Sequence, residues 1–537
     1  MIASAKAQGC PAMGVTLGLA KRLKIRLEQG HNTTAMNLLK VLFWPFWVII
    51  LVLTRLSDEL VRGTWHLIFR RKAEPLNIHG DAKWADYAML TKAMAFKRGG
   101  LLYGLFSKKG VAVDKLLRLY AHPESSVIGI AAKGMGKTQS TIAMLRDQVT
   151  GADKPDILCL DPAGDVSAVT VDLMRANGYD VKVADFRNAD SSDPLDVCSI
   201  LDPSDPMFDQ TLMGFCEGAV EDDSGGRDEH WTESSRGLVY AILFGFMKVD
   251  GERTPMFKMA QALTDAKERT KVFKRFAHLY NPTLRAGLNA FLEASDKERG
   301  SFTTTVTRKV RVWLLDGVRR ITSEHSVARS WTFRELWTAD KPSAVFIIVG
   351  LRSDRNSEGA VARVAITNAV MTRQKMWDEG KRRDRNFKFR RRMVAAIDEG
   401  LMLGNCRAIV DANVQLRKAG WLQWLMYPSL EDVRELFGRA AAASLMGGCI
   451  RFVFGGSGEL GTYREFSEQL GKTTIDNPNY NESDRGASTG GSAASRNLAN
   501  PDELRGMPDT MGAAIVRDLN VQFYKPYGFR NGEPYYP

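Results

Sequence analysis

Short apolar runs alternate with amphipathic stretches along most of the chain after residue 75. The apolar run at 127–131 predicts a strand, and the stretch at 138–149 places its apolar residues roughly on one side of a helix. Two further apolar runs, at 157–160 and 181–186, predict strands. This β–α–β–α–β order predicts a mostly parallel sheet with helices on both faces.

The strand pattern fades between about 205 and 335. Segments 232–248 and 256–294 have helical periodicity, so we expect an all-helical insertion in this part of the chain. Residues 478–500 are rich in Asn, Ser, Gly and Ala and are expected to form a mobile loop. The alternating strand pattern returns in the apolar runs at 344–350, 393–397 and 450–456.

The most apolar run of the chain, VLFWPFWVIILVL, occupies 41–53. It is shorter than the roughly 20 residues that cross a bilayer, but the wider segment at about 35–54 reaches that length. Basic residues lie on both sides of it, so the positive-inside rule predicts no orientation. We expect residues 1–74 to be a membrane-associated region with an open number of crossings; a buried core helix is the alternative.

The charge balance favours an anionic partner. Lys and Arg outnumber Asp and Glu by 74 to 62, which gives a net charge of +12. This excess suits nucleic acid or a lipid headgroup surface and does not choose between them. The six cysteines are scattered without a C-x-x-C pair, so the bulk of the chain is expected to be cytosolic, with reduced thiols.

The segment AAKGMGKT at 131–138 follows a predicted strand and opens a predicted helix. It matches the phosphate-loop pattern G-x-x-x-x-G-K-[ST] except at Ala131, where alanine is tolerated if its φ is negative. Backbone N–H groups of such a loop converge on phosphate at a helix N-terminus. The predicted nucleotide-binding residues are Ala131, Ala132, Lys133, Gly134, Met135, Gly136, Lys137 and Thr138.

An acidic pair, Asp398 and Glu399, ends the apolar run at 393–397. Asp398 is predicted to hold Mg²⁺ together with the hydroxyl of Thr138, and Glu399 to polarise the attacking water. Lys137 would meet the β- and γ-phosphates, so Lys137 and Glu399 are candidate catalytic residues with ATP and Mg²⁺ as cofactors. The alternative is an ordinary acidic pair on the surface at the end of a strand.

A basic run, KRRDRNFKFRRR, occupies 381–392 between a predicted helix and a predicted strand. It is either a solvated connector or part of a path for a polyanion backbone, and the sequence favours neither. Phe387 and Phe389 within it either pack inward or stack on a ligand.

The order of these landmarks resembles the coupling proteins of type IV secretion, the TraG/TraD group of conjugation ATPases. The resemblance covers roughly 75–537 and rests on the order and spacing of its motifs. The matching segments are HGDAKWA at 79–85, the phosphate loop at 131–138, DPAGD at 161–165, HW at 230–231, IDE at 397–399, LRKAG at 416–420, LFG at 436–438, the segment 451–475 and PYY at 534–536.

The resemblance implies an α/β fold: a RecA-like P-loop NTPase core with a mostly parallel sheet, an inserted all-α domain that faces the incoming substrate, and an N-terminal membrane segment. It implies a homo-hexameric ATP hydrolase, anchored in the bacterial inner membrane, that recruits relaxase-bound DNA or protein substrates for a type IV secretion channel. The expected parts are 1–74, a first nucleotide-binding part at 75–204, the helical domain at 205–335 and a second nucleotide-binding part at 336–537.

Two positions qualify this expectation. Arg417 matches an arginine that the family often has, which implies a finger for a neighbouring subunit's nucleotide; the alternative is a cation at a helix C-terminus. Pro428 stands where the family usually has a Gln that senses the γ-phosphate, and proline has no side-chain donor. Two other functions therefore stay open: a substrate receptor with a structural, non-hydrolysing ATP site, and a general DNA-pumping ATPase, against which the helical insertion and the His79 motif speak.

Overall fold

The computed structural model describes residues 79–108, 116–222, 229–279, 281–323, 331–350, 358–456, 458–483 and 486–528. These belong to one compact unit that begins at Asn77. The predicted membrane-associated region at 1–74 lies outside the described residues. Among the helices of the described part, none has the length and apolar character needed to span a bilayer.

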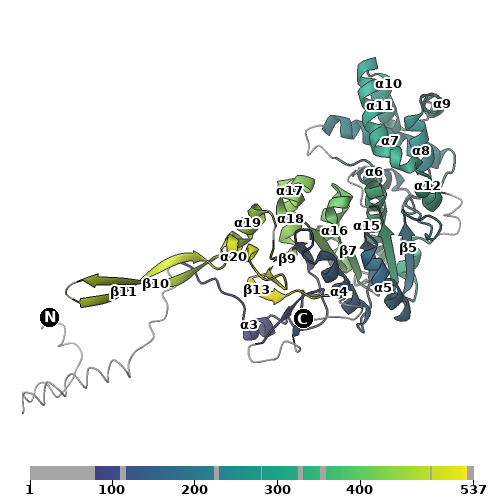
Figure 1. Ribbon diagram of the computed structural model, residues 1–537. Helices are drawn as coiled ribbons and strands as arrows, with labels where there is room; N and C mark the ends of the chain where they lie inside the picture. The colour runs from purple at the N-terminus through teal and green to yellow at the C-terminus, as the bar shows by residue number, and fades with distance from the viewer. Residues whose placement is uncertain are drawn as a thin grey trace, which may run out of the picture. The chain divides into compact units, whose positions relative to one another are not determined.

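Parallel strands form one side of an 11-stranded sheet, up to its edge strand β5, in the spatial order β9-β3-β8-β7-β4-β6-β5. Figure 1 labels β9, β7 and β5 of this series. The predicted α/β class with a mostly parallel sheet is therefore confirmed. The strands are β3 (Ser126–Ile130), β4 (Asp156–Leu160), β5 (Asp180–Asp185), β6 (Ser343–Ile348), β7 (Met393–Ile397), β8 (Trp421–Tyr427) and β9 (Cys449–Phe454).

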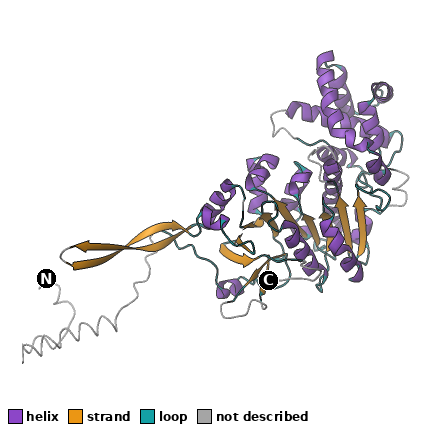
Figure 2. Ribbon diagram, in the orientation of Figure 1, coloured by secondary structure: helices purple, strands orange, loops and turns teal. Residues whose placement is uncertain are grey.

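Helices cover both faces of this sheet (Figure 2). Successive strand residues point to opposite faces, so that Leu158 of β4 packs into one apolar core and Cys159 into the other. Strands buried on both faces read as continuous apolar runs, which is why the sequence pattern revealed them. The helices of one face are α4 (Lys137–Val149) and α5 (Asp165–Ala176); those packed into the other core include α15 (Glu358–Arg383), α16 (Arg407–Gln415), α17 (Leu430–Phe437), α18 (Arg439–Gly447) and α19 (Leu460–Leu470).

Antiparallel strands extend the sheet beyond β9, in the order β2-β1-β13-β12-β9. The sequence pattern had not predicted them. Their bounds are β1 (Leu102–Phe106), β2 (Leu117–Tyr120), β12 (Met511–Val516) and β13 (Leu519–Tyr524). Strand β13 thus brings the chain's last described residues back beside its first described strand.

Helices occupy the chain between β5 and β6, as the periodicity predicted, and gather in the upper right of Figure 1. Helices α7 and α10 pack closely where Gly237 and Gly287 meet. A Cβ atom at position 287 would lie only 2.2 Å from the Gly237 carbonyl oxygen, so only glycine fits there. The division of the chain into four parts stays a prediction. The bounds are α6 (Phe208–Ala219), α7 (Glu229–Lys248), α8 (Met256–Thr264), α9 (Ala266–Phe276), α10 (Pro282–Leu292), α11 (Asp296–Val310), η3 (Arg311–Leu314), α12 (Asp316–Thr322) and α14 (Phe333–Thr338).

The prediction of a mobile loop at 478–500 is wrong. Strands β10 (Lys472–Ser483) and β11 (Gly486–Asn497) pair antiparallel along their whole length, from Lys472 opposite Asn497 to Ser483 opposite Gly486. The ladder consists of backbone hydrogen bonds, which need no alternation of apolar and polar side chains. A segment rich in Asn, Ser and Gly therefore forms a hairpin that its composition does not reveal.

Candidate nucleotide site

The phosphate loop connects the end of β3 to the start of α4. Gly134 and Gly136 have φ values of +82° and +89°, the left-handed region in which glycine is favoured. Ala131 is not among the described non-glycine residues with positive φ, and it is buried, with its N–H donating to the Tyr427 carbonyl oxygen at 3.0 Å. The backbone at Ala131 therefore does not need glycine. This agrees with the expectation that alanine is tolerated here if its φ is negative.

Lys137 begins helix α4 and reaches back across the loop. Its Nζ donates to the Ala131 carbonyl oxygen at 3.0 Å and to that of Ala132 at 3.5 Å. The same nitrogen lies 3.9 Å from Oε2 of Glu399. The amine is thus held beside the loop by neutral carbonyls and one loose ion pair, in a place from which it can meet a phosphate.

Asp398 follows strand β7 and lies against the first turns of α4. The Thr138 hydroxyl donates to its Oδ2 at 2.8 Å, and the Thr141 hydroxyl donates to its Oδ1 at 2.6 Å. Only 7% of the Asp398 surface is exposed. Burial raises the pKa of this carboxyl, and the two threonine hydrogen bonds oppose the rise.

Thr141 is a site residue that the sequence analysis missed. Besides Asp398, its hydroxyl oxygen contacts the Trp424 indole, whose Nε1–H donates to it at 3.0 Å. Thr138 and Thr141 are three residues apart in a helix and so lie on the same face. This spacing was the available signal.

Glu399 comes directly after Asp398, and 29% of its side chain is exposed. Burial raises the pKa of this carboxyl; the positive charge of Lys137 opposes the rise, and the negative charges of Asp398 and Asp432 add to it. A partly buried carboxylate with a raised pKa, open to solvent on one side, suits the acceptance of a proton from water.

The donor set at this edge of the sheet fits a magnesium nucleotide. Mg²⁺ prefers oxygen ligands and is usually held by one or two carboxylates together with phosphates and waters. Thr138 and Asp398 place a hydroxyl and a carboxylate 2.8 Å apart at the carboxyl ends of β3 and β7, next to the phosphate loop. Ligands of open α/β sheets bind at this edge.

The last described segment of the chain, 525–528, packs on the loop and was not predicted to do so. Lys525 is 1% exposed, and its Nζ donates to the Met135 carbonyl oxygen at 3.0 Å. The Gly528 N–H donates to the Gln139 carbonyl oxygen at 3.1 Å. Burial lowers the pKa of Lys525 to about 8. Since it lies 390 residues from Met135, only the folded chain reveals this contact.

Residues 83–519 match the family model described as type IV secretory system conjugative DNA transfer. The chain belongs to this family. The resemblance inferred from the order of motifs is therefore confirmed.

Curated relatives and solved structures agree with this assignment. The type IV secretion system-coupling protein VirD4 of Bartonella quintana (strain Toulouse) is 24% identical over 390 residues, which are 68% of this chain and 56% of the relative. VirD4 of Bartonella henselae is 23% identical over 373 residues, 65% of this chain and 53% of the relative. The chain thus spans about half the length of these curated relatives.

Among solved structures, the plasmid coupling protein TrwB in complex with ADP and Mg²⁺ has a TM-score of 0.57 at 16% identity and covers 85% of this chain and 98% of its own. The unbound coupling protein TrwBdeltaN70 has a TM-score of 0.56 at 15% identity and covers 86% and 97%. At these identities the likeness shows a shared fold. It confirms the RecA-like α/β core.

The departure at Pro428 from the usual pattern of coupling proteins lies beside the phosphate loop. Strand β8 ends at Tyr427, whose carbonyl accepts from Ala131, and Pro428 follows at once. Gln423 does not replace the usual Gln, because it is buried within β8 and donates to the Ile409 carbonyl oxygen at 2.9 Å. The carboxyl end of β8, at Tyr427 and Pro428, therefore presents no side-chain amide to a nucleotide.

Arg417 is not brought to the phosphate loop of its own subunit. It precedes β8, and its guanidinium donates to Glu124 before β3 at 3.3 Å. Both residues lie at the amino end of the parallel strands, whereas the loop lies at the carboxyl end. Its side chain is 60% exposed, and its role as a finger for a neighbouring subunit stays a prediction.

The carboxyl end of the basic run at 381–392 is bound within the chain. The Nε of Arg391 donates to the buried carboxylate of Asp156 at 3.0 Å, and its other nitrogens donate to the carbonyls of Ala339 and Asp340. Phe389 packs inward, with the buried Arg373 guanidinium 3.4 Å from its ring centre. These contacts favour the connector interpretation for the end of the run.

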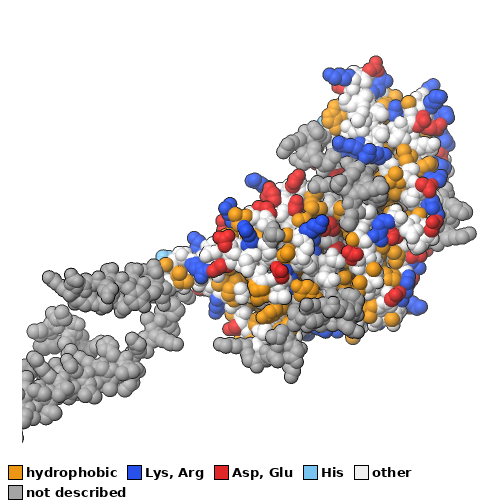
Figure 3. Space-filling view, viewed as in Figure 1, with side chains coloured by type: hydrophobic (Ala, Val, Ile, Leu, Met, Phe, Trp, Pro, Cys, Tyr) orange, Lys and Arg blue, Asp and Glu red, His pale blue; other side chains and the backbone are white. Residues whose placement is uncertain are grey.

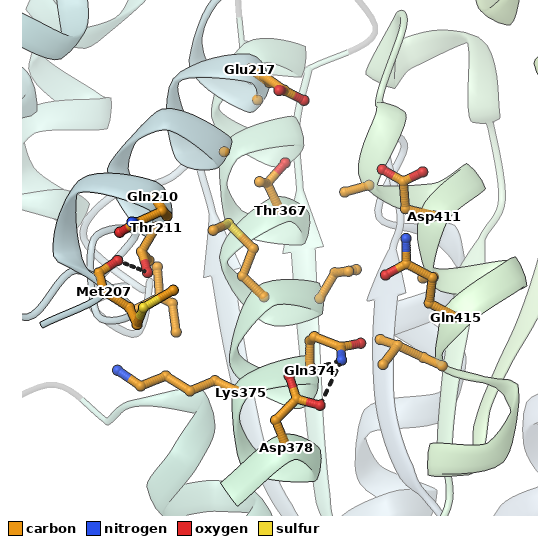
Figure 4. A pocket seen from close by; sticks show the side chains of 18 of the residues that line it. Met207, Gln210, Thr211, Glu217, Thr367, Gln374, Lys375, Asp378, Asp411 and Gln415 are labelled. Carbon is orange, nitrogen blue, oxygen red and sulfur yellow. Dashed lines mark hydrogen bonds between the residues drawn. The ribbon is translucent and has the colours of Figure 1, made fainter. Parts of the chain in front are cut away.

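A separate groove of about 490 Å³ lies among α6, α15 and α16 (Figure 4). Its lining includes no residue of the phosphate loop. Acidic side chains outnumber basic ones in its lining, and Lys375 is paired with Asp205, as is Arg407 with Asp411. It is therefore not an alternative nucleotide site.

Proposed function

We propose that this protein is a membrane-anchored ATPase that recruits a DNA–relaxase complex or protein substrates and delivers them to a type IV secretion or conjugation channel. The observation that carries the proposal is the meeting of Thr138 with Asp398 at 2.8 Å, beside the pair formed by Lys137 and Glu399. These residues come from two strands that are far apart in the chain. A phosphate-loop lysine and hydroxyl beside two strand-end acids support the proposed hydrolysis of ATP.

Each residue has a distinct part in this proposal. The loop N–H groups from Ala131 to Thr138 bind the phosphates, and Lys137 moves its amine from the Ala131 carbonyl to the β- and γ-phosphate oxygens. Thr138 and Asp398 hold Mg²⁺, which neutralises charge on the phosphates when bound. Glu399 orients the attacking water and accepts its proton.

The partners follow from the family and from charge. A net charge of +12 suits an anionic cargo, and we propose DNA, brought through a relaxase, or a protein substrate. We propose that residues 1–74 associate with the bacterial inner membrane and that the bulk of the chain is cytoplasmic. We further propose a homo-hexamer in which Arg417, exposed at the amino edge of the sheet, reaches the nucleotide of a neighbouring subunit.

Substitution of Lys137 tests the ATP site. Lys137→Ala is expected to abolish ATP hydrolysis, with and without DNA, because the phosphates lose their cation. The loop keeps the hydrogen bond from the Ala131 N–H to the Tyr427 carbonyl oxygen, so the fold should remain. The matched control is Lys133→Ala, an exposed lysine of the same loop that contributes through its backbone. Hydrolysis that is unchanged in Lys137→Ala, with a normal circular dichroism spectrum, would falsify the catalytic assignment.

A second function is favoured by Pro428: a substrate receptor whose ATP site closes subunit interfaces without turnover. The two functions differ in one measurement. Purified protein that binds ATP and assembles, yet releases no phosphate when single- or double-stranded DNA is added, would decide for the receptor.

A further inference from the structure

A buried ion pair joins the helices between β5 and β6 to the segment that follows the strand-end acids, Asp398 and Glu399. Figure 3 shows Lys, Arg, Asp and Glu side chains spread over the surface that is in view. The side chains of Glu221 and Arg363 lie in the interior instead, where they are 1% and 2% exposed. Glu221 follows helix α6 and Arg363 belongs to α15, and Arg363 Nη1 donates to Glu221 Oε2 at 2.8 Å.

This ion pair also binds the backbone that follows the strand-end acids. The acids are followed directly by a short 3-10 helix, η4 (Gly400–Leu403). Arg363 Nη1 donates to the Leu403 carbonyl oxygen at 2.7 Å, and the Asn405 N–H donates to Glu221 Oε1 at 2.6 Å. Both members of the ion pair therefore hold the carboxyl end of the turn that begins at the acids.

Gly404 makes room for the Glu221 carboxylate. Its φ of +64° lies in the left-handed region in which glycine is favoured. A Cβ atom at position 404 would lie only 1.9 Å from Glu221 Oε1. The carboxylate thus occupies space that any other residue at 404 would fill, so the turn and the ion pair fit each other closely.

The backbone of the same segment is bound by two helices that lie between β5 and β6. Lys309 of α11 is 2% exposed, and its Nζ donates to the Glu221 carbonyl oxygen. Arg236 of α7 donates to the preceding carbonyl oxygen, that of Val220, at 3.1 Å. Glu221 therefore contacts α11 through its main chain and the segment after η4 through its side chain.

Net stability alone gives a weak account of this ion pair. Two charges lose their hydration when they are buried, and apolar residues of similar volume often replace such a pair with little loss of stability. The use of a buried ion pair that we favour is to fix one arrangement of the segments that it joins. Here the segments are the turn after the strand-end acids, helix α15 and the connection to α11.

We propose that Glu221 is a positioning residue that couples the strand-end acids to helix α11, so that nucleotide binding at the acids restricts the motion of α11. The coupling rests on the proposed function in one respect: Asp398 holds the Mg²⁺ of a bound nucleotide. The bound nucleotide fixes the acids and η4, and the Asn405 N–H passes this restraint to the Glu221 carboxylate. Lys309 receives it at the Glu221 carbonyl oxygen. Chains of hydrogen bonds between rigid elements can carry coupling of this kind.

Hydrogen exchange of the full chain tests the coupling and does not require hydrolysis of ATP. The added ligand is Mg²⁺ with a non-hydrolysable ATP analogue, and amide exchange is measured at the phosphate loop, 131–138, and at α11. In the wild type, the analogue should slow exchange severalfold at both places, because it restricts local opening. Glu221→Leu with Arg363→Met replaces the ion pair by apolar side chains. This variant should keep the slowing at the phosphate loop and lose it at α11.

The matched control removes a different buried ion pair. Asp156→Leu with Arg391→Met acts at the amino end of the strands, on side chains that are 1% and 8% exposed, and should keep the slowing at both places. Lys309→Met is a second test variant, which leaves the Glu221–Arg363 pair intact and removes only its link to α11. It should lose the slowing at α11 alone, and it tests the coupling even if the ion-pair variant does not fold.

The proposal is overturned if α11 responds to the analogue in the ion-pair variant or in Lys309→Met as it does in the wild type. It is also overturned if the control loses the α11 response. A wild type that responds at the phosphate loop and not at α11 would overturn the coupling and leave the proposed ATP site standing. A wild type that responds at neither place would contradict the ATP site itself, and the coupling with it.

Discussion

At the amino end of the parallel strands, Asp156 and Arg391 lie buried and bind each other, whereas at the carboxyl end Asp398 and Glu399 lie beside groups that a ligand can use. Asp156 Oδ1 accepts from the Ser343 N–H, the Ser343 hydroxyl and Arg391 Nε, all within 3.0 Å. The Lys137 amine, in contrast, holds only loop carbonyls and stands 3.9 Å from Glu399. Acidic and basic side chains thus stabilise the fold at the amino edge. At the carboxyl edge, similar side chains are positioned to bind a ligand.

The largest expected effect is a loss of stability at the amino edge. Arg391→Met leaves the Asp156 carboxylate buried without its cation, which should lower the free energy of unfolding by about 3–5 kcal/mol. The matched control is Arg390→Met, whose side chain is 66% exposed and pairs with an exposed Asp340; it should change the value by less than about 1 kcal/mol. Urea denaturation midpoints measure both. Equal midpoints for the two variants would remove the distinction between the edges.

At the carboxyl edge, Glu399→Gln should act on turnover and leave stability nearly unchanged. Loss of the proton acceptor is expected to lower kcat by about 10²–10⁴-fold. Burial already disfavours the charged form of Glu399 and raises its pKa, so a neutral side chain of the same shape is tolerated. ATP hydrolysis and ATP binding are measured side by side, with Glu431→Gln as the exposed control. A variant that hydrolyses ATP normally would place the proton acceptor elsewhere.

The free energy of unfolding should depend on pH through Lys525, at the carboxyl edge of the sheet. Its pKa is about 8 in the folded chain and near 10.5 when unfolded, so the unfolded chain binds more protons between these values. The free energy of unfolding should therefore gain a rising contribution from pH 8 to pH 10.5. Lys525→Met removes that contribution, whereas Lys133→Met, at an exposed lysine, keeps it. Denaturation at pH 7, 8, 9 and 10 shows the difference; parallel curves for wild type and Lys525→Met would contradict it.

The smallest effect is expected at Arg417. Its side chain and that of Glu124 are 60% and 57% exposed, so Arg417→Ala should change the free energy of unfolding by less than about 1 kcal/mol. A larger loss, measured by the same urea titration, would show that this pair belongs with the buried network at the amino edge.

The sequence predicted the parts of the fold that depend on local pattern. The strands β3, β4 and β7 are buried on both faces and appear as apolar runs, and the phosphate loop appears as a motif between a strand and a helix. Because strands of a parallel sheet end at the same edge, the acids after β7 could be expected near the loop after β3.

Other parts depend on contacts between distant segments and could not be predicted in this way. The β10–β11 hairpin is held by backbone pairing, and its sequence does not alternate apolar and polar residues. Lys525 directly follows strand β13, and no local sequence pattern distinguishes it from other lysines. The basic run at 381–392 shows the same limit, since composition alone did not reveal that Arg391 is occupied by Asp156.

The first described residues are joined to the last strands by short backbone links. The Ala82 N–H donates to the Lys472 carbonyl oxygen at 3.0 Å, and the Ala85 N–H donates to that of Asn520 at 2.7 Å, within β13. Strand β13 then leads to Lys525, whose amine holds the Met135 carbonyl. The backbone at 82–85 is thus connected through β13 and Lys525 to the phosphate loop by hydrogen bonds. We therefore expect a displacement of this N-terminal backbone to be felt at the phosphate loop.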